Sequence, residues 1–326
     1  MTKAQTYDNR LDQLPRELAA AAHEFIAWSQ GQLLVEQVES TPTEPLYHYT
    51  GEVALKGILN NQHLWCFGHL HQRDRTEFAY SLGIARRVIR EVGLSEDFFR
   101  RHFCGCLDDL LDNNSLAHTF EFYMSSLSRH RDDPQQWIEY GHAGSGFAIG
   151  FAPKLFQPDE AELKEQANEN LHVGRVIYGD EATERRHRLV IERAAEITSR
   201  HGQAHVDAVR RVGPLRYLRT IVDEVIASQL IWNCLTAKGI RYANEREVRY
   251  LVLNLHGKFD AHRKTFGGKP YIEAKLPLKE PGSLTEILVG ALAPDDAEKK
   301  LSQLLDAQGY PAIPVSRSSA RLDPAA

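Results

Sequence analysis

The chain has few cysteines, no long apolar run and no apolar leader. Its four cysteines among 326 residues are too few for a disulfide scaffold, and Cys104 and Cys106 are too close in sequence to pair comfortably. No stretch approaches the roughly 18 apolar residues of a transmembrane helix, and the N-terminus lacks the apolar core of a secretory signal. We therefore expect a reduced, cytoplasmic protein with no membrane partner.

Familiar catalytic motifs are absent as well. The chain has no GxxxxGK[ST] phosphate loop, no GxGxxG dinucleotide fingerprint, no HExxH zinc motif and no GxSxG nucleophile elbow. A glycine-rich stretch at Gly144, Gly146 and Gly150 has the wrong spacing for a dinucleotide site. No enzyme class can therefore be assigned from a single strong motif.

Histidines are plentiful, fifteen in all, and four residues of metal-ligand type lie close together. They are His63, Cys66, His69 and His71. Trp65, Phe67 and Leu70 interleave with them as in a strand and a turn, and no second group stands at a recognised zinc spacing. We therefore expect ordinary core and surface side chains here, and no bound metal.

Charge is nearly balanced, with 39 basic and 44 acidic residues and a formal net charge of −5. This gives no general attraction for nucleic acid, although a local basic face is compatible with it. One basic stretch carries Arg185, Arg186, Arg188, Arg193, Arg200, Arg210, Arg211, Arg216 and Arg219. These arginines form either a surface for an acidic partner or a solvated face balanced by neighbouring glutamates. The glutamates are Glu181, Glu184, Glu192 and Glu196.

Hydrophobic periodicity predicts helices and strands along the chain. Leu14, Leu18, Ala21, Phe25 and Trp28 indicate an amphipathic N-terminal helix that ends between residues 31 and 40, before the proline-containing break at 41–45. Further helices are expected at 53–59, 84–92, 95–111 and 295–307, and over 181–232 with breaks near 202 and 213. Strands are expected at 46–51, 120–125, 146–151, 171–179, 248–255, 271–275, 286–289 and 312–315, the second of them half-buried.

This order of elements predicts an α+β fold. Strands occur early and late with helices between them, which favours one domain over two. We expect an N-terminal helical extension at 1–44 and a single catalytic-type domain at 45–315 with a helical insertion at about 181–232. The N-terminal helix is expected to pack on the outside of this domain, and the tail at 316–326 to be frayed.

The most informative segment places Glu245, Glu247 and Arg249 on one face of an expected strand. The opposite face carries Val248, Tyr250 and Val252. One interpretation is a solvent-facing strand with a ladder of ion pairs. The other is a pair of carboxylates about 7 Å apart that face a cleft, where one stabilises a developing cation and the arginine keeps it ionised.

Two further segments are weaker indications of a site. His48-Tyr49-Thr50 lies in the first strand after the proline break, and a buried His–Tyr pair is more often packing than catalysis. The serines Ser125, Ser126 and Ser128 occur in the strand after the helical pair and lead toward Trp137. Neither segment indicates a function alone.

Several short motifs follow one another in a recognisable order. They are Leu46-Tyr47-His48-Tyr49-Thr50, Leu55-Lys56-Gly57-Ile58-Leu59, His63-Leu64-Trp65, Arg73-Asp74-Arg75-Thr76-Glu77-Phe78, Ser126-Leu127-Ser128, Trp137, Tyr140, Gly146 to Phe151, Lys238 with Glu245-x-Glu247-x-Arg249, and Ile287-Leu288-Val289-Gly290. This order resembles a bacterial domain family of unknown function, family 2971, over about residues 45–315. Each motif is short, so the resemblance rests on their succession.

That family is similar in pattern to the ADP-ribosyltransferase fold, which implies a split or bent sheet with NAD as substrate in a cleft. The resemblance implies that His48 binds a ribose, with Tyr49 and Thr50 beside it. Ser126 and Ser128 would occupy the second strand, and Glu245 and Glu247 the catalytic strand. An aromatic wall is expected from Tyr49, Tyr123 or Trp137, and Arg249 would keep the carboxylates ionised.

We therefore expect an NAD-dependent, ADP-ribosyltransferase-like enzyme that modifies a macromolecule, such as a toxin or phage-defence effector. The acceptor, protein or nucleic acid, is left open, and an antitoxin or regulator is a further expected partner. His48, Ser126 and Glu247 should line one cleft, with Glu247 catalytic and Glu245 on the acceptor side. The alternatives are a non-catalytic module of the same fold that binds a nucleotide or nucleic acid, and a hydrolase of NAD or of another nucleotide.

Overall fold

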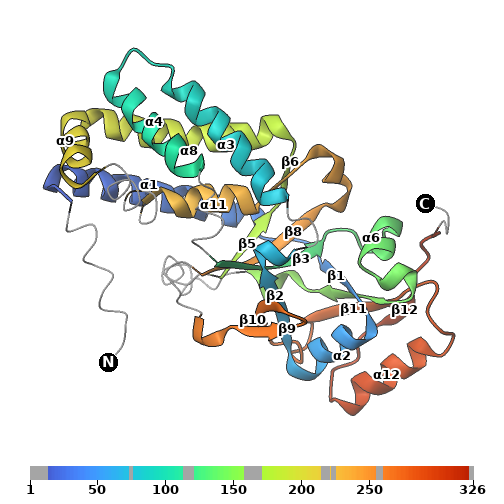
Figure 1. Cartoon of the computed structure of the whole chain (residues 1–326). Helices are drawn as coiled ribbons and strands as arrows, with labels where there is room; N and C mark the ends of the chain where they lie inside the picture. The colour runs from blue at the N-terminus through green and yellow to red at the C-terminus, as the bar shows by residue number, and fades with distance from the viewer. Residues whose placement is uncertain are drawn as a thin grey trace. The chain divides into compact units, whose positions relative to one another are not determined.

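A computed structural model describes residues 14–72, 76–112, 121–157, 171–213, 221, 225–254 and 260–322, arranged in two compact units. The helical unit comprises Met1–Glu36, Arg73–Glu121 and Ile177–Ala243, and the sheet unit comprises Gln37–Gln72, Phe122–Val176 and Asn244–Ala326. Figure 1 shows the long helices in the first unit and most of the strands in the second. The α+β class is confirmed, and a single domain with the limits 45–315 stays a prediction.

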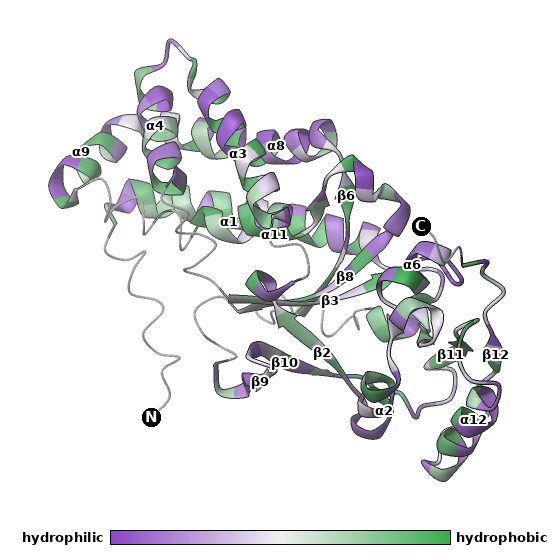
Figure 2. Ribbon diagram, turned by 45° about the vertical axis from the view of Figure 1, so that its right-hand side comes forward, coloured by the Kyte–Doolittle hydropathy of each residue, from purple (hydrophilic) through white to green (hydrophobic). Residues whose placement is uncertain are grey.

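Helices build most of the helical unit. They are most of α1 (Arg16–Ser40), α3 (Glu77–Gly93), α4 (Phe98–Asp112), α8 (Asp180–Arg200), α9 (Gly202–Val212) and α11 (Ala227–Leu235). A short parallel pair, β6 (Ile177–Tyr178) with β7 (Ala237–Lys238), accompanies them. Figure 2 shows that α4, α8 and α9 each carry hydrophilic and hydrophobic residues, as amphipathic helices do. Of the helices that the structure describes, none is both long and apolar enough to cross a membrane.

The predicted helix boundaries are confirmed at several positions. Asp97 caps α4, because its carboxylate accepts hydrogen bonds from the backbone N–H of Phe99 at 2.9 Å and of Arg100 at 3.4 Å. α8 ends at Arg200 and α9 begins at Gly202, at the predicted break. In contrast, α3 begins at Glu77, well before the predicted start at residue 84.

The arginines of α8 are held by carboxylates of the same unit. Arg193 and Arg200 both bind Glu24 of α1, and Arg186 binds Glu36, also of α1. Other ion pairs join Arg185 to Glu181, Arg188 to Glu91, Glu184 and Glu192, Arg193 to Glu196, and Arg210 to Asp207. The N-terminal helix is therefore bound to the helical insertion, and many of the basic side chains are balanced internally. Arg216 and Arg219 lie outside the described residues.

Among the described residues, ten strands form a sheet at the centre of the sheet unit. Its strands are β1 (Leu46–Thr50), β2 (His63–Gly68), β3 (Glu121–Ser128), β4 (Phe147–Phe151), β5 (Leu171–Arg175), β8 (Glu247–Asn254), β9 (Lys264–Phe266), β10 (Lys269–Lys275), β11 (Leu284–Val289) and β12 (Val315–Arg317). The main path runs β12-β11-β4-β1-β3-β2-β10-β9, and β8 joins β3 to β5. Among the pairs of this sheet with a described register, only β11 with β12 is parallel, and α12 (Ala297–Ala307) lies between these strands in sequence.

Strand β3 is the branch point of the sheet. β2 pairs with its N-terminal half, through Phe67–Met124 and Gly68–Tyr123, whereas β1 pairs at its end, through Tyr47–Ser128. β8 is a third neighbour of β3. β3 is largely buried, and Ser126 is the one exposed side chain among its described residues, so the predicted half-buried alternation is wrong. Apart from Ser126, the described side chains on both faces of β3 are therefore covered by packing.

The main core of the sheet unit packs on one sheet face. Leu64, Cys66, Val248, Tyr250 and Ile272 contribute to it from β2, β8 and β10, together with apolar residues of α2 (Glu52–Asn61) and α12. The 171–179 segment forms two strands rather than one, and the last strand begins at Val315, later than predicted. Of the motif from Arg73 to Phe78, residues 73–75 lie outside the described residues.

The glycine-rich stretch serves close backbone packing. A Cβ at Gly146 would lie 2.3 Å from the carbonyl oxygen of Thr50, and one at Gly290 would lie 2.2 Å from that of Gly144. The N–H of Gly290 donates to the carbonyl of Gly146 at 2.8 Å. Only glycine permits these approaches, which bring the ends of β1, β4 and β11 together.

The C-terminal segment is anchored as far as the structure describes it, so the expectation of fraying from residue 316 is wrong for 316–322. Asp132 accepts hydrogen bonds from Ser318 Oγ at 2.6 Å and from the N–H of Ser319 at 2.8 Å. Burial raises the pKa of Asp132, but the bonds from Ser318, Trp137 and Ser319 outweigh that effect and lower it. The carboxylate therefore fixes the residues that follow β12.

Candidate active site

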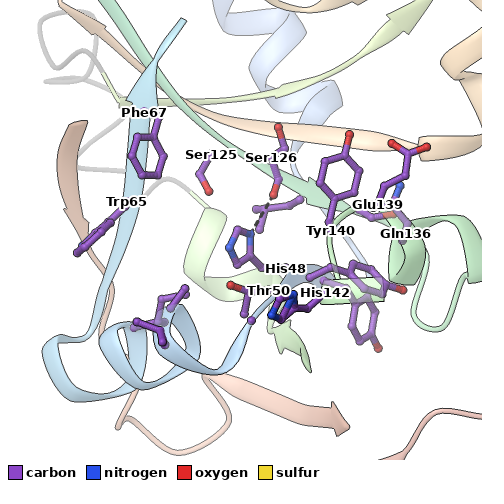
Figure 3. A pocket seen from close by; sticks show the side chains of 18 of the residues that line it. His48, Thr50, Trp65, Phe67, Ser125, Ser126, Gln136, Glu139, Tyr140 and His142 are labelled. Carbon is purple, nitrogen blue, oxygen red and sulfur yellow. Dashed lines mark hydrogen bonds between the residues drawn. The ribbon is translucent and has the colours of Figure 1, made fainter. Parts of the chain in front are cut away.

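A cavity of about 1190 Å³ lies in the sheet unit beside the branch point at β3. Residues of β1, α2, β2, β3 and α6 (Pro134–Glu139) line it, together with Glu245 and Glu247 near the start of β8. Figure 3 shows His48 between the aromatic rings of Trp65 and Phe67 on one side and Tyr140 on the other. A polar centre flanked by aromatic side chains is typical of a small-molecule site.

His48 lies on β1 and faces the backbone of β3. Its Nδ1 lies 3.1 Å from the carbonyl oxygen of Ser126, the dashed line in Figure 3. Because a carbonyl only accepts, Nδ1 carries the proton and donates. Burial lowers the pKa of His48, although the bond to Ser126 opposes the shift, so the ring is neutral near pH 7. The neutral ring leaves Nε2 able to accept a hydrogen bond from a ligand hydroxyl.

Glu247 begins β8, and its carboxylate is held from two sides. Ser126 Oγ donates to Oε1 at 2.5 Å, and Arg249 donates from Nε to Oε1 at 2.9 Å and from Nη2 to Oε2 at 3.1 Å. Glu247 and Arg249 are only 4% and 2% exposed. The interpretation of this strand as a solvent-facing ladder is therefore wrong. Charge-assisted bonds of this kind fix the orientation of the carboxylate.

Glu245 lines the same cavity but does not lie on the strand as predicted. It ends a 3-10 helix at Ile240–Glu245, and Arg246 follows with a left-handed φ of 43°. The expected two-residue strand spacing between the carboxylates therefore does not apply. A non-glycine residue in this conformation is strained, and such residues concentrate at functional sites.

Tyr49, Thr50 and Ser128 also line the cavity, as the sequence predicted. The hydroxyl of Tyr49 donates to the carbonyl of His130 at 3.0 Å and accepts from the N–H of Asp133 at 3.1 Å. Burial raises the pKa of Tyr49. Ser128 Oγ donates to the carbonyl of Glu245 at 2.9 Å. Tyr49 and Ser128 therefore support the framework of the site while they contribute to its wall.

Trp137 and Tyr123 do not supply the expected aromatic wall. Both are fully buried, at 0% exposure. The Trp137 indole donates from Nε1 to Asp132 at 2.6 Å, and its ring packs edge-on against Tyr49 with 5.0 Å between the ring centroids. The helix that carries Trp137 turns it into a small core of its own, with Ala148 and Leu288 among its members. Arg249 binds Glu247 but is not among the residues that line the cavity.

The sequence interpretation missed the residues that do form the walls. Trp65, Phe67 and Phe266 contribute on the β2 side, and Glu139, Tyr140 and His142 on the α6 side. The alternation of half-buried Trp65 and Phe67 with buried Leu64 and Cys66 was visible in the sequence as a strand. Nothing in the sequence distinguished its half-buried face as the wall of a cavity.

No group of three or more His, Cys, Asp or Glu side chains among the described residues is arranged to hold a metal ion. Cys66 is buried in the core, where burial raises the pKa of its thiol to about 12. His63 faces Glu273, and the ring of His69 accepts the N–H of Phe122 at 3.3 Å. The former metal candidates thus belong to different local environments.

Residues 136–250 match the family described as "Protein of unknown function (DUF2971)". The matched range contains Glu245, Glu247 and Arg249 but not His48 or Ser126, so the cavity extends beyond the DUF2971 match. The expected resemblance is confirmed over this shorter range. No curated protein and no solved structure is significantly similar to the chain.

Proposed function

We propose that this protein is an NAD-dependent, ADP-ribosyltransferase-like enzyme with an ADP-ribosyltransferase-like sheet, and that Glu247 is its catalytic carboxylate. The proposal rests above all on the hydrogen bond from Ser126 to Glu247 at 2.5 Å, at the wall of a cavity that His48 also lines. A carboxylate fixed in advance beside a binding cavity stabilises positive charge as it develops. The branched pairing at β3 supports a cleft in the sheet.

The chemistry uses the groups of the cavity as follows. The bond between ribose C1′ and the nicotinamide nitrogen breaks, and nicotinamide leaves as a neutral molecule with the bonding electrons. The sugar gains oxocarbenium character, which the charge of Glu247 stabilises. His48 Nε2 accepts a hydrogen bond from a ribose hydroxyl. An oxygen or nitrogen of the acceptor then bonds to C1′, and its proton leaves to the Glu245 carboxylate and from there to solvent.

Nicotinamide release from NAD by the purified full chain tests this function. Glu247→Gln keeps the shape of the side chain but removes the charge. We expect turnover to fall by roughly two to three orders of magnitude, corresponding to about 3–4 kcal/mol, while NAD binding by titration is retained. Glu280→Gln, at an exposed position outside the cavity, is the matched control. A thermal unfolding curve of Glu247→Gln checks that the variant stays folded although the buried Arg249 has lost its charged partner.

The outcomes separate the alternatives. Release of nicotinamide without label on any macromolecule would identify an NAD hydrolase that uses water as acceptor. NAD binding without turnover would identify a non-catalytic module. Glu245→Gln should lower transfer to the acceptor more than it lowers NAD hydrolysis. The roles of the two glutamates are reversed if Glu247→Gln stays active and Glu245→Gln is inactive.

A further inference from the structure

Three strands of the sheet unit carry an unusual aromatic surface. Trp65 and Phe67 of β2 lie on the strand face opposite to Leu64 and Cys66, which fill the core. The register pairs Phe67 with Tyr271 of β10, so these rings share one sheet face. We call Trp65, Phe67, Phe266 and Tyr271 the aromatic face.

The rings of the aromatic face contact one another at different angles. Trp65 is tilted by 59° from Phe266 and by 71° from Phe67, and Tyr271 is only 7% exposed, so a base can stack on Trp65, Phe67 or Phe266 singly. Trp65 and Tyr271 are stacked, with 4.4 Å between the ring centroids, and Phe266 lies 5.3 Å from Trp65. A phenylalanine ring that served the core would be hidden from solvent, but Phe266 is 58% exposed on β9. Since the core of this sheet lies on the opposite side, an exposed phenylalanine here adds little to stability.

Three lysines lie on the two strands β9 and β10 that carry part of this face. Lys264, Lys269 and Lys275 are exposed on β9 and β10, and Glu273 is the acidic residue between them. Lys264 Nζ lies 2.6 Å from Glu273 Oε2, so this ion pair neutralises the acidic charge. Lys269 and Lys275 then give the face a net positive charge. Aromatic rings interleaved with lysines are the combination that binds single-stranded nucleic acid, through base stacking and phosphate contacts.

The aromatic face is continuous with the candidate active site. Trp65, Phe67 and Phe266 line the cavity that also contains Glu247. Figure 3 shows Trp65 and Phe67 on the side of the cavity away from Tyr140. A base that stacks on this wall would therefore lie at the mouth of the cavity, where an acceptor must approach the reacting sugar.

We propose that the aromatic face binds a single-stranded nucleic acid and presents one of its nucleotides to the cavity as acceptor. This deepens the proposed function, on which the acceptor role rests, whereas binding itself does not depend on NAD turnover. Duplex nucleic acid cannot place its bases on the rings without unstacking them.

Fluorescence anisotropy of a labelled single-stranded oligonucleotide of about twelve nucleotides tests the binding, with duplex of the same sequence as comparison. We expect Phe266→Ala, at an exposed position that tolerates truncation, to weaken single-strand binding by about tenfold. Trp65→Ala should weaken it at least as much. The double variant Lys269→Gln with Lys275→Gln should make the dependence of log affinity on log salt shallower by roughly 1.4. Lys299→Gln with Lys300→Gln, exposed on α12, is the matched control and should change neither.

Transfer to the oligonucleotide is followed separately with labelled NAD. The Lys269→Gln and Lys275→Gln variant should retain nicotinamide release in the absence of nucleic acid while it loses label on the oligonucleotide. Binding without any nicotinamide release would leave the aromatic face supported and overturn the proposed enzyme. Nicotinamide release without single-strand binding, or binding that is unchanged in Phe266→Ala and Trp65→Ala, would overturn this inference alone. Equal affinity for duplex and single strand would also overturn it. The same holds if the label from NAD is found on protein and not on the oligonucleotide.

Discussion

Ser126 Oγ lies 2.5 Å from Glu247 Oε1, although the two residues are 121 positions apart in the sequence. The contact joins neighbouring strands, because β3 and β8 pair in the sheet. The backbone carbonyl of Ser126 also accepts the hydrogen bond from His48. Ser126 therefore connects the two other residues of the proposed site, one through its side chain and one through its main chain.

We expect Ser126→Ala to slow nicotinamide release by about ten- to a hundredfold. The substitution removes a hydrogen bond to a charged group, worth about 1.5–3 kcal/mol, and frees one side of the Glu247 carboxylate. The rate with saturating NAD measures the effect. Ser302→Ala removes a hydroxyl that binds a helix carbonyl on α12, away from the cavity, and serves as control. An unchanged rate in Ser126→Ala would show that positioning of Glu247 by this serine is unimportant.

Stability should fall as the pH drops from about 6.5 toward 4, in part because of His172. Burial lowers the pKa of His172 to about 4 in the folded protein, whereas an unfolded histidine titrates near 6.5. Between these values the unfolded chain binds more protons, so the free energy of unfolding rises with pH. The stabilisation is fully present above about pH 6.5 and is lost as the pH falls through the folded value.

Chemical denaturation at pH 7 and pH 5 measures this effect. We expect His172→Leu to lose about 2 kcal/mol less stability than the parent protein between these two pH values. Burial also lowers the pKa of His187 to about 3 and of His205 to about 4, so the variant keeps part of the pH dependence. If the free energy of unfolding falls by the same amount in both proteins between pH 7 and pH 5, His172 does not contribute to the pH dependence.

Asp132→Ala should release the C-terminal segment. The substitution leaves the donors of Ser318, Ser319 and Trp137 without their acceptor, at about 1–3 kcal/mol for each buried group. Local opening should then expose the peptide bonds after Arg317 and Arg321 to trypsin. We expect cleavage there to accelerate about tenfold or more, as measured by mass spectrometry.

Asp295→Ala, at an exposed position just before α12, is the control for this experiment. Equal cleavage of both variants and of the parent protein would mean that β12, with Arg317 bound to Glu298 at 3.2 Å, holds the segment without Asp132.

The local elements follow from the order of the amino acids. The spacing of apolar residues identified α1, α12 and the strands β1 and β4, because each pattern depends on side chains within one element. The N-cap of α4 is equally local, because Asp97 binds the N–H of Phe99 only two residues away. His48, Ser126 and Glu247 are nominated as a set through the resemblance to the family, since the residues alone give only weak indications.

Where these side chains meet, and which of them face the cavity, depends on how the strands pair and pack. The pairing of β1, β2 and β8 with β3 joins segments that are distant in sequence, and no local pattern encodes that register. The same long-range packing buries Trp137 in a core. Glu245 lies before the strand, because Arg246 between them is left-handed. Trp65, Phe67 and Phe266 come together in one wall of the cavity. Local periodicity assigns a residue to a face of its own element, but whether that face meets core, cavity or solvent depends on which elements pack against it.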